Sequence, residues 1–154
     1  MGKRPVIRMT RFIASRSLAA ALVLSACSTA DDPASLGAPQ EGGLLFLVQT
    51  EPATVVMEAL YEGEVRRDDR GCIRLATEDR HTVVWPFGFK LGVRSDGPHV
   101  LDERGRDVGR IGGSFRLGGG EVPYLHDGIP LGSAHRAAAE ARCPGRYWIV
   151  GAVP

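Results

Sequence analysis

Glycine and proline interrupt this chain at short intervals, and this spacing limits what it can fold into. The 154 residues include 20 glycines and 10 prolines, and beyond Leu44 few stretches run ten residues without either. Both residues disfavour helix interiors, and turn residues at this spacing are typical of many short strands. The pattern therefore predicts an all-β domain.

Local patterns place the elements of this domain. Apolar residues alternate with Glu58, Glu62 and Glu64 in segment 55–67, as in a half-buried strand, and Thr-Val-Val-Trp at 82–85 is strongly strand-like. The alanine-rich segment 133–142 predicts one short late helix with Ser133 as its N-cap. The favoured architecture is a small OB-like barrel, and the alternative is a small β-sandwich.

The first 27 residues predict export. Five basic residues precede an apolar run of about nine residues at 18–26, which is too short for a membrane span of about 20 residues. The run ends in Leu24-Ser25-Ala26-Cys27, which resembles the lipobox of bacterial lipoproteins. The alternatives are an ordinary secretory signal peptide and a retained N-terminal anchor.

The lipobox resemblance implies a location and a domain plan. The leader 1–26 is cut before Cys27, which is thioether-linked to a diacylglycerol and is often acylated at its new amino terminus. The exported protein is then held by acyl chains on the outer face of the plasma membrane, or in the periplasm or outer membrane of a Gram-negative cell. Residues 27–43 form a lipidated cysteine and a flexible tether, and 44–154 form a single β-rich domain.

Charge excludes one class of partner. The chain has 19 basic and 18 acidic residues; the leader holds five basic residues and no acidic one, so the mature part has 14 against 18, a net charge of −4. A nucleic-acid-binding domain needs a clustered basic face. We therefore expect no nucleic-acid partner, and membrane contact through the lipid anchor.

The cysteines predict one disulfide. With Cys27 assigned to lipid, Cys72 and Cys143 remain, and an oxidising compartment favours their pairing. Two free buried thiols are the alternative. Neither cysteine lies in a C-x-x-C pair, so zinc binding by cysteine is not indicated.

Candidate ligand-binding residues are few. Trp85 and Trp148 lie in the two strongest strands, where an aromatic ring either stacks on a ligand or packs in the core. Tyr124, Phe87 and Phe89 are further aromatic candidates, with Tyr147, and Glu121 ends a glycine-rich segment that either lines a groove or lets strands cross closely. His126 lies in an irregular loop and is either a functional residue or part of a solvated turn.

No local motif indicates a cofactor, a metal ligand set or a catalytic residue. The four histidines do not pair at i,i+2 or i,i+4, and segment 112–120 lacks the Lys-Ser/Thr ending of a phosphate loop. Residues 83–86, 118–123 and 143–148 together resemble small exported bacterial domains, from which no site residue is carried over.

Three hypotheses for function follow. The first is a non-enzymatic envelope lipoprotein whose domain binds an envelope protein or a glycan. The second is a small metal-binding protein or hydrolase of the envelope that uses His126 and nearby carboxylates. The third is a purely structural tethered module. Clustering of His126 and Asp127 with another histidine in one cleft would favour the second hypothesis.

Overall fold

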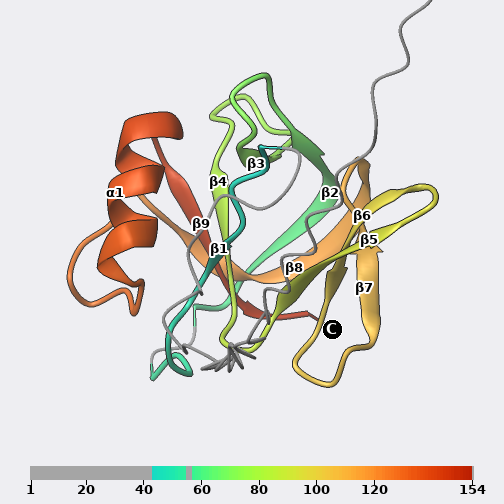
Figure 1. The fold of residues 1–154 in the computed structure, drawn as a ribbon. Coiled ribbons are helices and arrows are strands. Elements are labelled where there is room, and N and C mark those ends of the chain that lie inside the picture. Colours follow the sequence, from blue (N-terminus) through green and yellow to red (C-terminus); the bar gives the residue numbers. More distant parts are fainter. Residues whose placement is uncertain (1–42, 55–56, 154) are drawn as a thin grey trace, which may run out of the picture. The chain divides into compact units, whose positions relative to one another are not determined.

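Figure 1 shows the computed structural model, which describes residues 43–54 and 57–153. The leader, Cys27 and the tether up to residue 42 lie outside the described residues, so the lipobox remains a prediction. No helix within the described ranges is long and apolar enough to cross a membrane.

Five strands of the domain pair in a closed ring. The order β4-β3-β2-β8-β9 closes because β9 pairs back with β4. The β4–β9 pairing is parallel and the other four are antiparallel. The short strand β1 pairs with β4 in parallel. The bounds are β1 Leu47–Val48, β2 Ala59–Arg67, β3 Ile73–Leu75, β4 Thr82–Trp85, β8 Gly113–Val122 and β9 Tyr147–Ala152.

A second sheet and one helix complete the described fold. Strands β5 Lys90–Arg94, β6 Gly97–Leu101 and β7 Asp107–Arg110 form a three-stranded antiparallel sheet between β4 and β8 in the sequence. Helix α1, Ser133–Arg142, lies between β8 and β9 in the sequence and beside β9 in Figure 1. The all-β prediction with one late helix is confirmed, and a closed ring of five strands agrees with the OB-like barrel.

The core has two parts because β4 is buried on both faces. Val83 and Trp85 pack in one cluster with residues of β2, β3, β8, β9 and the small sheet. Val84, on the opposite face, packs in a second cluster that includes Ala139 of α1. A strand covered on both sides reads as a continuous apolar run, which is why 82–85 is so strand-like in the sequence.

The disulfide joins the beginning of β3 to the end of the helix. Cys72 and Cys143 are bonded, with Cα atoms 5.8 Å apart, and both are fully buried. The structure therefore contains the pairing expected from the cysteine count.

One local prediction needs correction. Ser133 is not the N-cap: the cap is Gly132, without a side-chain hydrogen bond, because the helix already includes Ser133. The glycine-rich segment forms most of the ten-residue strand β8. Its glycines do permit close approach, since a Cβ on Gly119 would collide with the carbonyl oxygen of Ile149 in β9.

Candidate functional site

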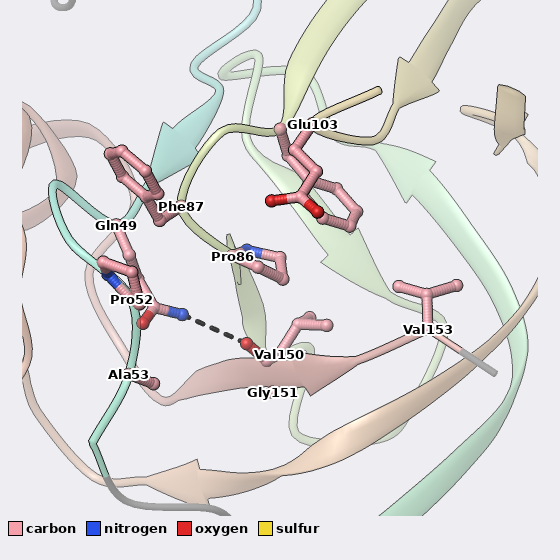
Figure 2. A pocket seen from close by; sticks show the side chains of 10 residues that line it. Gln49, Pro52, Ala53, Pro86, Phe87, Glu103, Val150, Gly151 and Val153 are labelled. Atoms are coloured by element: carbon pink, nitrogen blue, oxygen red, sulfur yellow. Dashed lines mark hydrogen bonds between the residues drawn. The ribbon is translucent and has the colours of Figure 1, made fainter. Parts of the chain in front are cut away.

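A pocket of about 330 Å³ lies where β4 and β9 end, and we call it the Phe87 pocket. Its volume is at the lower end of small-ligand sites, which span roughly 300–1,000 Å³. Figure 2 shows its walls, which come from four separate segments of the chain. The lining residues are Gln49, Pro52, Ala53, Pro86, Phe87, Phe89, Glu103, Val150, Gly151 and Val153.

Gln49, which lines the pocket, has a buried polar atom that lacks a hydrogen-bond partner. The residue is 2% exposed, and its Nε2 donates a hydrogen bond to the carbonyl of Val150 at 3.0 Å. That bond fixes the amide orientation, because only the NH₂ group can donate to a carbonyl. Oε1 then has no hydrogen-bond partner among the described residues. An unpaired buried acceptor costs about 1–3 kcal/mol.

Phe87 and Glu103 supply the rest of the chemistry. Phe87 is 45% exposed although it is a large aromatic residue, whereas Phe89 is partly buried against the core. Pro86 ends β4, so Phe87 leaves the strand alternation and turns its ring outward. Glu103 is exposed and is the one titratable side chain among the lining residues. The pocket thus combines an exposed ring with oxygen acceptors.

Trp85 lies in the hydrophobic core. Its side chain is 0% exposed and packs between Phe46, Phe89 and Phe115, with ring centroids 5.6–6.3 Å away. A fully buried ring cannot stack on anything from solvent, so the structure gives no support to ligand binding by Trp85. Its place is the core, the other interpretation that the sequence allowed.

Trp148 and Glu121 lie side by side on neighbouring strands. They are register partners in the β8–β9 pair, and Trp148 is 9% exposed. His81 stands edge-on to the Trp148 ring at 6.4 Å, and its Nε2 is 2.9 Å from Oε2 of Glu121. Burial lowers the pKa of His81 more than the nearby Asp79 raises it, and Arg146 lowers it further. The net effect of these surroundings is a pKa for His81 below the ordinary histidine value.

Tyr124 and His126 lie in the loop between β8 and α1. Tyr124 is 65% exposed and meets the His126 ring edge-on at 6.2 Å. The Nδ1 atom of His126 accepts a hydrogen bond from the Gly128 amide at 3.1 Å. No second histidine joins His126 and Asp127 in a metal-ligating group among the residues that the structure describes. The solvated turn is therefore the better interpretation of His126.

The sequence patterns did not indicate Gln49 or His81 as site residues. A lone glutamine after the apolar run 44–48 carries no motif, and only the fold brings it to Val150, 101 residues later. Asp79 and His81 do have an Asp-x-His spacing beside a strand, but their partner Glu121 is distant in sequence.

Comparisons with protein-family models, curated proteins and solved structures find no match for this chain.

Proposed function

We propose that this chain is an exported, lipid-anchored binding protein whose β domain binds a glycan of the bacterial envelope in the Phe87 pocket. One observation carries the proposal: Phe87, whose aromatic ring is exposed, and Gln49, whose buried Oε1 has no hydrogen-bond partner among the described residues, are both lining residues of one pocket. The anchoring through Cys27 rests on the lipobox.

The polarity of the pocket favours a sugar over a peptide. A sugar ring presents C–H faces, which pack on an aromatic ring, and many hydroxyl donors at its edge. Oε1 of Gln49 and the carboxylate of Glu103 are both acceptors, and the other side chains that line the pocket are apolar. A peptide would also need donors for its own carbonyl groups, and the only lining side chain with a donor is Gln49, whose NH₂ group already donates to the Val150 carbonyl.

A binding role is favoured over hydrolysis by the same residues. Glycoside hydrolysis commonly requires two carboxyl groups that flank the scissile bond. Glu103 is the single carboxylate among the lining residues, and no histidine or cysteine accompanies it there. The pocket therefore has the parts for recognition without those for this reaction.

The test is calorimetric titration of the full chain, in non-ionic detergent, with the peptidoglycan disaccharide GlcNAc–MurNAc. We expect saturable one-to-one binding that Phe87→Ala weakens by about tenfold, or ~1.4 kcal/mol. Tyr124→Ala is the matched control, because Tyr124 is an exposed aromatic residue outside the pocket. Absence of binding to this probe, or equal losses in the two variants, would overturn the proposal.

A further inference from the structure

Three side chains meet beside the beginning of β4, at the opposite end of this strand from Pro86 and the Phe87 pocket. His81 directly precedes β4, Asp79 lies two residues earlier in the same turn, and Glu121 belongs to β8. One ligand atom of each residue lies within 4.8 Å of the others. The fold thus joins an imidazole and two carboxylates from segments about 40 residues apart.

The Nε2 atom of His81 faces this cluster but forms no hydrogen bond in it. The residue is 6% exposed, and 2.9 Å separate its Nε2 from Oε2 of Glu121. Nε2 nevertheless has no hydrogen-bond partner among the described residues. Two ligands of one tetrahedral zinc ion stand roughly 3.3 Å apart, and each is directed at the ion instead of at the other. The contact therefore resembles a pair of ligands more than a hydrogen bond.

The other ring nitrogen has the partner that a metal-binding histidine needs. Nδ1 of His81 lies 3.3 Å from the hydroxyl oxygen of Thr77. A hydrogen bond from Nδ1–H to such an oxygen fixes the ring and the tautomer, which leaves the lone pair of Nε2 for an ion. His81 thus has a positioned ring and a free ligand atom.

Arg146 gives the two carboxylate oxygens of Glu121 different roles. Its guanidinium pairs with Oε1, so Oε2 is the oxygen that faces His81. This pairing orients Glu121 as a one-oxygen ligand. Asp79 is exposed, and its side chain can turn towards an ion. The two carboxylates together balance the charge of a divalent cation, and the Arg146 charge limits the affinity.

We propose that Asp79, His81 and Glu121 bind a divalent transition-metal ion of zinc's class. One imidazole nitrogen with two carboxylate oxygens suits Zn²⁺, which takes mixed nitrogen and oxygen ligands. Ca²⁺ and Mg²⁺ are bound by oxygen ligands at six or more positions, so they fit this set poorly. Three protein ligands leave a four-coordinate ion one open position.

The test is calorimetric titration of the chelator-treated full chain with ZnCl₂. We expect one Zn²⁺ per chain, with the affinity at least tenfold lower in Asp79→Asn and in Glu121→Gln. Both substitutions keep the side-chain shape at exposed positions, so the fold should be retained. Glu78→Gln is the matched control, since it removes the same charge from the neighbouring exposed residue outside the cluster. Titrations with MgCl₂ and CaCl₂ should show no comparable binding.

A second measurement needs no substitution at the buried His81. In nitrogen-15 NMR spectra, Zn²⁺ should shift the Nε2 resonance of His81 and leave those of the exposed His126 unchanged. The proposal is overturned if the wild-type chain binds no Zn²⁺, if Asp79→Asn and Glu121→Gln bind it as tightly as Glu78→Gln, or if the His81 resonance does not move.

Discussion

The carboxylate of Asp68 accepts a hydrogen bond from Nε of Arg74 at 2.7 Å, and both side chains are at most 10% exposed. Asp68 also accepts hydrogen bonds from the backbone amides of Arg70 and Cys72 at 3.0 and 2.8 Å. Arg74 in turn donates to the Arg80 carbonyl and to the Thr82 hydroxyl. This pair therefore ties the β2–β3 turn to the turn that precedes β4.

Asp68 should make the fold sensitive to acid. Burial raises the pKa of Asp68, but the Arg74, Cys72 and Arg70 donors together lower it more, so the pKa lies below its ordinary value. A lowered folded-state pKa gives stability that is present above the unfolded value of about 3.9 and is lost as the pH falls through the folded value. We expect the free energy of unfolding, measured in urea, to decline as the pH falls below about 4.

Asp68→Asn isolates this contribution. At pH 7 we expect a loss of about 2 kcal/mol, because charge-assisted hydrogen bonds to a buried carboxylate are lost. The difference from the wild type should shrink as the pH falls below about 4, and it should vanish only below the lowered folded-state pKa, where the carboxylate of the folded wild type becomes protonated. Asp69→Asn, at the exposed neighbour, is the control and should stay within ~0.5 kcal/mol. A difference that stays constant with pH would contradict the assignment.

Gly119 should tolerate no side chain. A Cβ there would collide with the Ile149 carbonyl oxygen, which is backbone and cannot rotate away, and would lie 3.0 Å from Nε1 of Trp148. We expect Gly119→Ala to lower the free energy of unfolding by about 3 kcal/mol. Gly151→Ala in β9 is the control, because a Cβ there meets no atom within 4 Å. Equal midpoints for both variants in urea would show that β8 and β9 are less tightly packed than described.

The disulfide should contribute substantially to stability. It links residues 71 positions apart, and in the chain-entropy model such a loop is worth about 4 kcal/mol. The double variant Cys72→Ser/Cys143→Ser should lose about this much free energy of unfolding, and the reductant dithiothreitol should destabilise the wild type but not the variant. Cys27→Ser controls for the loss of a cysteine as such. A wild-type midpoint unchanged by the reductant would argue against the bond.

The sequence predicted the elements whose signals are local. Thr82–Trp85 and Ser133–Arg142 coincide with β4 and α1, because a fully buried strand and an alanine-rich helix each carry their signal in consecutive residues. The exposure of a single aromatic residue cannot be predicted from its neighbours in the sequence. Trp85 and Phe87 are two residues apart, yet one is in the core and the other at a pocket, because Pro86 ends the strand alternation between them.

Sites whose residues come from different strands of the ring also cannot be predicted from local sequence patterns. Gln49 meets Val150, and His81 meets Glu121, only because parallel pairing of β4 with β9 closes the ring. Parallel pairing between distant strands leaves no turn motif in the chain. The glycine-rich segment before Glu121 indicated this residue as a candidate. Its contacts with His81 and Arg146 could not be predicted from that segment.

Cys27 should decide whether the protein is attached to a membrane. If the lipobox is read as in bacterial lipoproteins, wild-type cells grown with labelled palmitate should show labelled protein in the membrane fraction. Cys27→Ser removes the thiol that would carry the diacylglycerol, so the label should be lost. Membrane attachment should be lost with it, because stable anchoring needs more than one acyl chain and the variant would lack both chains of the diacylglycerol. Ser28→Ala, one residue beyond the box, is the control and should behave as wild type. Labelled, membrane-bound Cys27→Ser protein would exclude lipidation at this residue.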